Sequence, residues 1–248
     1  MGRASALLKT PRGAAFVALL AVLVVYYAVA ESLPNMTLWW EVTFLGVVLI
    51  PAIFGITWLV LPLWQAKGLG LAGAAFGVLA VLCEVAALDI LADFSKLAAL
   101  TLISFWFLVF FETVLWVALV AAIIPLVDAF SVFRGPTGHI VEERPSIFET
   151  IAFGFPVPGE QEPARLGPPD LMFFGLFLAA AARWHLRVGW TWVAMAASFG
   201  VTLALAVWLE LSGLPALPLL SLGFLIPNAD LIWREIRGAR QRRALTDE

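Results

Sequence analysis

The chain is poor in charge and has almost no cysteine. Only 13% of its 248 residues are charged, whereas 62% are hydrophobic, and the mean hydropathy is +0.96. The single cysteine, Cys83, excludes an internal disulfide and a cysteine-based zinc site. The two histidines, His139 and His185, fall on opposite faces of the spans predicted below, so a shared metal site is not expected.

Several other signatures are also missing. The sequence has no Gly-x-Ser-x-Gly and no His-Glu-x-x-His motif, which argues against serine hydrolases and zinc proteases. It has no visible internal repeat, whereas inverted repeats are typical of many carriers. We therefore expect a function that needs no metal or organic cofactor.

Long apolar runs are abundant, and they predict a multi-pass membrane protein. A run over 97–133 would be about 55 Å long as one helix at about 1.5 Å per residue, far beyond a hydrocarbon core of about 30 Å. We split it near Phe111-Glu112-Thr113, which predicts an all-α bundle of about eight spans, with nine as the alternative. The other runs cover residues 14–30, 39–64, 69–92, 166–183, 188–210 and 214–233.

Charge placement favours eight spans. The basic N-terminus, Lys67, the Arg183/Arg187 turn and the arginine-rich C-terminus all fall on one side, as the positive-inside rule requires. The other side receives a turn predicted at Asp93–Lys96 and the loop over 134–165. We expect an integral protein of a prokaryotic plasma membrane with a cytoplasmic C-terminus. The first run also resembles a secretory signal, but a retained span is favoured because further spans follow at once.

The predicted organisation has four parts. N-terminal helices occupy 1–133, an extramembrane loop 134–165, a three-span part 166–233 and a basic tail 234–248. Within the loop, residues 147–155 are apolar enough to form a short strand or to lie at the membrane interface.

Acids recur inside the predicted spans or at their ends. A charged residue at the bilayer centre costs at least about 2.5 kcal/mol, so such residues are usually functional or face a wet cavity. Glu84 and Glu112 have two candidate roles, in a proton relay or in a polar contact between helices. The acids that fit interfacial positions at span ends are Glu41, Asp89, Glu210 and Asp230. The eight acids are Glu41, Glu84, Asp89, Glu112, Asp128, Asp170, Glu210 and Asp230.

Asp128 and Asp170 differ from the other acids in position. Asp128 lies shortly before the loop and Asp170 shortly after it, on consecutive antiparallel helices, so both are expected about 8 Å below the same membrane face. Two carboxyls that face each other share a proton, and one can then act as a base while the other acts as an acid. This arrangement suits activation of water against a peptide carbonyl. A proton or ion pathway and a structural polar pair are the alternatives.

The residues around these acids form three motifs, Val127-Asp-Ala-Phe-Ser-Val-Phe133, Leu166-Gly-Pro-Pro-Asp170 and Leu214-Pro-Ala-Leu-Pro218. In this order they resemble the Tyr-Asp, Gly-x-Gly-Asp and Pro-Ala-Leu signatures of the presenilin and signal peptide peptidase family of intramembrane aspartyl proteases. The resemblance covers residues 120–233, and the first hundred residues match only in being hydrophobic.

This resemblance implies an aspartic endopeptidase that hydrolyses transmembrane segments, with Asp128 and Asp170 as the catalytic pair. Its substrates would be transmembrane peptides or membrane proteins that enter laterally from the lipid bilayer, and no nucleic-acid partner is expected. The residues implied to shape the site and to hold the substrate are Gly167, Pro169, Pro215, Ala216 and Leu217.

Two positions depart from the family pattern. Val127 stands where the family has tyrosine, and Pro169 stands where it has the second glycine. Proline lacks an N–H and fixes φ near −65°, so backbone freedom beside Asp170 is reduced. An altered or inactive homologue that only binds membrane segments, or a proton-coupled transporter, is therefore the alternative to a protease.

Overall fold

The computed structural model describes residues 7–134, 150–211 and 214–246. Its first half is a series of helices. The first comprises α2 (Pro11–Val29) and η1 (Ala30–Ser32), and the second α3 (Leu38–Phe44), η2 (Leu45–Leu49), α4 (Ile50–Val60) and η3 (Leu61–Gln65). These are followed by α5 (Leu69–Val85), α6 (Asp89–Phe107), η4 (Leu108–Phe110) and α7 (Val114–Arg134).

The second half begins with a small hairpin. Strands β1 (Phe153–Phe155) and β2 (Ala164–Leu166) pair antiparallel, with Gly154 opposite Arg165. The expectation of a strand within 147–155 is thus confirmed for β1, while 147–149 lies outside the described residues. Three helices follow, α10 (Pro168–Arg183), α11 (Val188–Trp208) and α12 (Leu217–Thr246).

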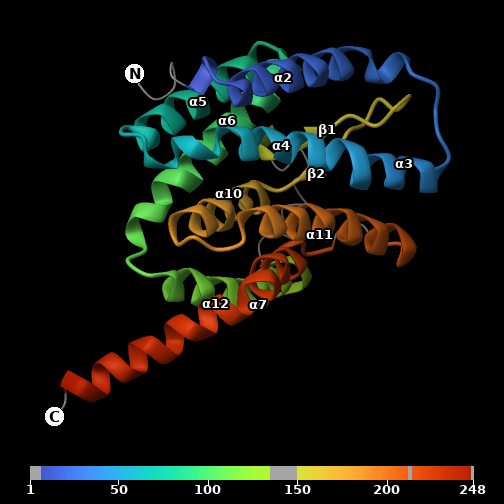
Figure 1. Cartoon of the computed structure of the whole chain (residues 1–248). Coiled ribbons are helices and arrows are strands. Elements are labelled where there is room, and N and C mark those ends of the chain that lie inside the picture. Colours follow the sequence, from blue (N-terminus) through green and yellow to red (C-terminus); the bar gives the residue numbers. More distant parts are fainter. Residues whose placement is uncertain (1–6, 135–149, 212–213, 247–248) are drawn as a thin grey trace.

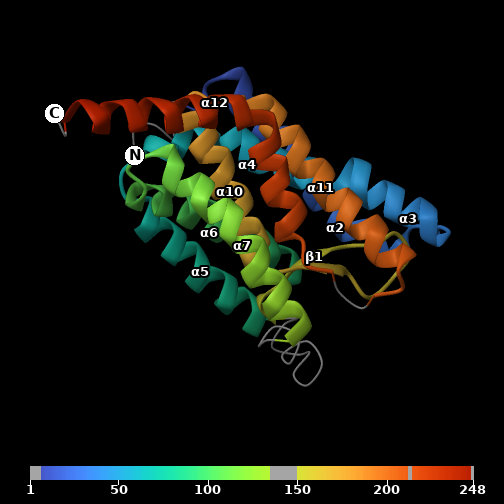
Figure 2. The same cartoon turned by 90° about the horizontal axis from the view of Figure 1, so that it is seen from below.

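The all-α architecture predicted from the apolar runs is confirmed. Among the described helices, five segments are long and apolar enough to cross a membrane, and the count of eight spans stays a prediction. Consecutive segments run back and forth, so the N- and C-terminal ends lie at the same end of the bundle (Figures 1 and 2). The five segments are Pro11–Ser32, Leu38–Gln65, Asp89–Phe110, Val114–Ser131 and Val188–Trp208.

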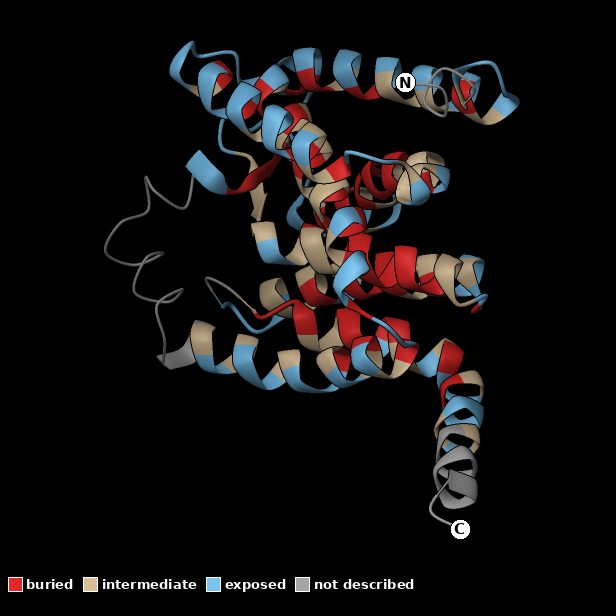
Figure 3. Ribbon diagram, turned by 90° about the vertical axis from the view of Figure 1, so that its left-hand side faces the viewer, coloured by how far each residue is buried: buried red, intermediate tan, exposed pale blue. Residues whose placement is uncertain are grey.

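The short helix α10 forms the centre of the bundle. All residues from Phe174 to Ala181 are buried, so this helix is covered on every side, as a helix that is apolar all round requires. Stacked rings join it to its neighbours, with centroid distances of 3.9 Å between Phe54 and Phe174 and 4.8 Å between Phe177 and Phe224. Buried residues gather on the inward faces of the helices (Figure 3).

The break predicted near Phe111-Glu112-Thr113 is confirmed, although no glycine or proline marks it. Helix α6 tightens into η4, and Phe111 then adopts an extended conformation. The Arg183 Nη1 donates a hydrogen bond of 2.7 Å to the Leu108 carbonyl oxygen. A cation from α10 thus satisfies a carbonyl at the helix end, which a glycine-based cap would otherwise do.

The turn predicted at Asp93–Lys96 is wrong, since both residues lie inside α6. The chain turns earlier, at Ala86–Leu88, so the run over 69–92 belongs to two helices. Leu88 N–H donates to the Cys83 carbonyl and Ala87 N–H to the Glu84 carbonyl, which together form a Schellman motif. Ala87 occupies the left-handed position at φ 55° where glycine is usual, so the sequence carries no turn signal.

Helix α12 is longer than the span predicted at 214–233. It runs from Leu217 to Thr246, so the tail predicted from residue 234 begins as a continuation of this helix. Pro227 lies inside α12, where it removes a helical hydrogen bond. The helix changes direction and its C-terminal part leaves the bundle (Figures 2 and 3).

Candidate active site

Asp170 lies in the first turn of α10, directly after the hairpin. Strand β2 ends at Leu166, Gly167 is the N-cap, and Pro168 and Pro169 occupy the first two helical positions, where a missing N–H costs little. The Asp170 N–H donates to the Gly167 carbonyl oxygen at 3.1 Å. Asp170 is the acidic residue of this first turn, where a negative charge is favoured by the helix dipole.

Gly167 leaves room for this carboxylate. An added Cβ at Gly167 would lie 3.3 Å from Asp170 Oδ2 and 3.6 Å from Pro169 Cδ. Its φ of −66° and ψ of 147° are open to any residue, so the glycine is needed for space and not for backbone freedom. A side chain here would press on the acid itself.

Asp128 lies on α7 and reaches the start of α12. Its Oδ2 accepts a hydrogen bond of 3.1 Å from the Leu217 backbone N–H. Leu217 is the first residue of α12, where backbone N–H groups lack helical partners, and Ala216 before it has no side chain that could cap them. Asp128 supplies that cap from another helix. Pro215, Ala216 and Leu217 are all buried around the contact.

The two acids approach each other from different pairs of helices. Helix α7 packs chiefly against α12, and α10 packs chiefly against α6, while α7 and α10 touch only locally. Asp128 is nevertheless the carboxylate that acts electrostatically on Asp170. The structure thus brings Asp128, Asp170 and Leu217 into one region, with Gly167 and Pro169 beside Asp170. Val127 is more than half exposed on the outer face of α7.

The hairpin is bonded to the N-terminal helix, a connection that no pattern in the sequence predicts. Tyr27 Oη donates to the Gly154 carbonyl oxygen at 2.8 Å, and Tyr26 Oη donates to that of Pro156 at 2.7 Å. The Gly159 N–H donates to the Ala30 carbonyl at 2.9 Å. These bonds link segments about 130 residues apart and fix β1.

A partly buried ion cluster also holds this strand. Lys96 Nζ lies 2.9 Å from Glu84 Oε2 and 3.4 Å from Asp93 Oδ1, and its side chain is only 12% exposed. Lys96 also donates to the Ala152 carbonyl at 3.2 Å, and the Gly154 N–H donates to Asp93 Oδ1 at 3.3 Å. Glu84 is therefore paired in a polar helix contact, one of the two roles that its sequence position left open.

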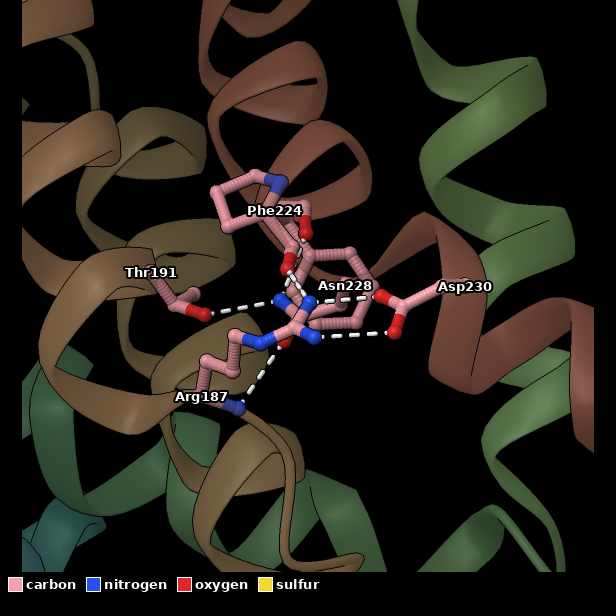
Figure 4. A network of polar contacts seen from close by, with 6 residues as sticks. Arg187, Thr191, Phe224, Asn228 and Asp230 are labelled. Carbon is pink, nitrogen blue, oxygen red and sulfur yellow. Dashed lines mark hydrogen bonds and ion pairs between the residues drawn. The ribbon is translucent and has the colours of Figure 1, made fainter.

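The remaining acids lie away from this region or on the surface. Glu112 is exposed in the break between α6 and α7, and Glu210 is exposed at the end of α11. Asp230 is bound by Arg187, with Arg187 Nη2 2.8 Å from Asp230 Oδ2 (Figure 4). The Arg187 N–H also donates to Asn228, whose amide donates to Thr191 (Figure 4).

Asp128 and Asp170 lie at one end of the bundle, and a group of cations lies at the other. We call the end with the hairpin, the Lys96 cluster, Asp128 and Asp170 the carboxylate end. We call the opposite end, with Arg12, Lys67, Arg183 and Arg187, the basic end. His185 lies in the turn at the basic end, and His139 lies outside the described residues. In the part of the chain that the structure describes, no group of three or more His, Cys, Asp or Glu is placed to hold a metal ion.

Comparison with known proteins identifies no relative of this chain. No protein-family model, curated protein or solved structure matches the chain. The interpretation of the site therefore rests on its own residues and their contacts.

Proposed function

We propose that the protein is an intramembrane aspartyl endopeptidase in which Asp128 and Asp170 together activate water. One carboxylate would take a proton from the water as it attacks the peptide carbonyl, and the other, protonated, would give its proton to that carbonyl oxygen. Collapse of the tetrahedral intermediate then breaks the C–N bond. The carboxyl that took the proton from water gives it to the leaving amine, and the hydroxyl formed from the carbonyl oxygen returns its proton to the other carboxylate. No metal or organic cofactor takes part in these steps.

The observation that carries the proposal is the hydrogen bond from Leu217 N–H to Asp128 Oδ2 at 3.1 Å. It joins the first and third motifs, which lie 89 residues apart in sequence. Asp170, from the second motif, is within electrostatic reach of the same carboxylate. A chance similarity in three short motifs gives no reason for all three to meet in space.

Strand β2 offers a means of holding an extended substrate. A helix shields its own carbonyls, so a transmembrane segment must unwind before it can be cut. On the described residues β1 pairs with β2 alone, and its backbone is also bonded to Tyr27 and Asp93. Strand β2 ends four residues before Asp170. A substrate strand added alongside β2 would lie beside the acid.

We further propose that the basic end faces the cytoplasm of a prokaryotic cell. Arg12, Lys67, Arg183 and Arg187 lie at this end, together with the C-terminal arginines that follow α12 out of the bundle. The carboxylate end would then face the outer side, and cleavage would occur near that face.

The test is cleavage of a labelled single-span peptide by protein reconstituted in liposomes. Wild type is expected to release two fragments, and Asp128→Asn and Asp170→Asn are expected to release none above background. Asparagine keeps an oxygen that can accept the Leu217 N–H, so Asp128→Asn preserves the cap while removing the acid. Glu210→Gln is the matched control, because it removes an exposed carboxylate and should cut like wild type. An uncut peptide with wild type, or equal cutting by all variants, would refute the protease.

Binding of membrane segments without cleavage is the second candidate. Asp128 accepts the first N–H of α12 and Asp170 lies in the first turn of α10, and both are structural uses of a carboxylate at a helix N-terminus. Pro169→Gly separates the two functions, because it restores the glycine of the family motif. A catalytic site held back by the proline should gain activity, whereas a binding protein should stay inactive while still retaining the peptide.

A further inference from the structure

A cavity of about 570 Å³ opens at the basic end, away from both aspartates. It lies where η3 leads into α5 and where α6 and α10 end. Two cations from distant parts of the sequence, Lys67 and Arg183, line it, and no Asp or Glu does so within the described ranges. Such a lining favours an anion.

The Arg183 side chain is held by two contacts. One of its guanidinium nitrogens donates to the Leu108 carbonyl, and the group lies 4.7 Å from the centre of the Trp184 ring. A guanidinium has five N–H donors, so the bond to Leu108 leaves others for a ligand. Lys67 is exposed and lines the same cavity, so it adds a second cation.

The start of α5 adds backbone donors to the same wall. Gly68 is the N-cap in a left-handed conformation at φ 78°, and it has no side chain to satisfy the first N–H groups of the helix. Nothing lies within 4 Å of the position where its Cβ would be. Helix N-termini of this kind favour negative charge, and here the open terminus reinforces the two cations.

Two tryptophans place the cavity at the depth of lipid headgroups. Trp64 and Trp106 line it, and they lie near the ends of the spans Leu38–Gln65 and Asp89–Phe110. Tryptophan at span ends marks the membrane–water interface. Basic pockets between transmembrane helices at this level suit the phosphate of a lipid.

We propose that this cavity binds the phosphate of an anionic phospholipid headgroup. Arg183 and Lys67 pair with the phosphate oxygens, the first N–H groups of α5 point toward them, and the acyl chains follow the outer surfaces of α5 and α6. The site is separate from Asp128 and Asp170 and does not depend on proteolysis.

Native mass spectrometry of the purified full chain tests the site. Wild type in micelles should retain phosphatidylglycerol in preference to phosphatidylcholine. Lys67→Gln should lower that retention about fivefold, the change expected from about 1 kcal/mol for one cation near anionic lipid. Lys9→Gln, which removes an exposed cation that does not line the cavity, should retain the lipid like wild type.

Three results would overturn the proposal. Wild type could show no preference for the anionic lipid, or the two lysine variants could lose it equally, which would indicate diffuse surface attraction. In a separate arm, inorganic phosphate is added to delipidated protein. Binding of phosphate without binding of the lipid would assign the cavity to a free anion. Because Lys67 is exposed, an unchanged thermal transition of Lys67→Gln shows that the loss of lipid is not a loss of fold.

Discussion

The Lys96 cluster at the carboxylate end is largely covered by the fold, whereas the Arg187–Asp230 pair at the basic end is exposed to solvent. At the carboxylate end Lys96 is 12% exposed and serves two acids and a strand carbonyl. At the basic end the side chains of Arg187 and Asp230 are 43% and 46% exposed, and Arg187 also donates to the Pro227 carbonyl. Both clusters therefore contact backbone, but only the Lys96 cluster does so under cover of the fold.

This difference suits the functions proposed for the two ends. A site that activates water needs its acids positioned by backbone that does not move, and the Lys96 cluster and the tyrosine bonds immobilise the hairpin that leads to Asp170. A surface that meets lipid headgroups needs accessible cations. Substitution of corresponding residues at the two ends tests whether the ends differ in this way.

The largest effect is expected from Lys96→Gln. It leaves Glu84 and Asp93 close together without a cation, and the loss of one partner from a mostly buried cluster should cost about 3 kcal/mol in the free energy of unfolding. Lys96→Arg keeps the charge and should cost much less. Arg187→Gln at the basic end should change stability little, because the pair it breaks is exposed to solvent. Denaturant titration in mild detergent measures the free energy of unfolding of all three variants. Equal losses of stability for Lys96→Gln and Arg187→Gln would show that the two ion pairs do not differ.

A smaller effect is expected from the tyrosines that hold the hairpin. Tyr27→Phe leaves the Gly154 carbonyl without its side-chain donor in a buried place and should cost about 1.5 kcal/mol. Tyr26→Phe removes an equivalent bond that is only partly buried, and it should cost about half as much. The same titration compares them. Only the Tyr27 change should also slow cleavage, since Gly154 belongs to the strand paired with β2.

Asp128 allows its structural and chemical roles to be separated. Asp128→Ala removes the cap on Leu217 N–H and should cost about 1 kcal/mol, as loss of a helix N-cap usually does. Asp128→Asn retains an acceptor and should be nearly as stable as wild type, although we expect it to be inactive. If alanine and asparagine were equally stable, the hydrogen bond to Leu217 would contribute nothing to the fold.

The smallest effect is expected at the helix ends, and it stabilises the protein. Ala87 at the carboxylate end has φ 55°, and Ala87→Gly should relieve about 1 kcal/mol of left-handed strain. His185 holds the same position at the basic end with φ 53°, but histidine tolerates this conformation better, so His185→Gly should gain less. Thermal unfolding of the two variants compares the gains, and a loss of stability at Ala87 would contradict the motif assigned there.

Much of the helical framework could be predicted from hydropathy and length alone. The break near Phe111 followed from the impossible length of one helix, and the bounds of α10 and α11 followed from turns that carry charge. The turn at Ala86–Leu88 could not be predicted, because alanine gives no sign of a left-handed conformation. The length of α12 was also missed. The prediction ended the span where the basic residues begin, but basic residues do not by themselves end a helix.

The candidate site, too, could be predicted only in part. The order and spacing of the motifs were enough to single out Asp128, Asp170 and Leu217. The hydrogen bond between Asp128 and Leu217 required the three-dimensional packing of α7 on α12, which no local pattern encodes. Lys96 was predicted in a turn between two spans, on the side that holds the 134–165 loop. Its acids come from α5 and from its own helix, so only the packed structure brings them together.

The most direct measurement is the cleavage rate of the single-span peptide by Asp128→Asn, Asp170→Asn and the double variant, side by side in liposomes. Two acids that share one proton work as a unit, so each single change should lower the rate about a thousandfold and the double change should lower it no further. Independent, multiplying effects of the two changes, or single variants that cut as fast as wild type, would contradict a shared catalytic site.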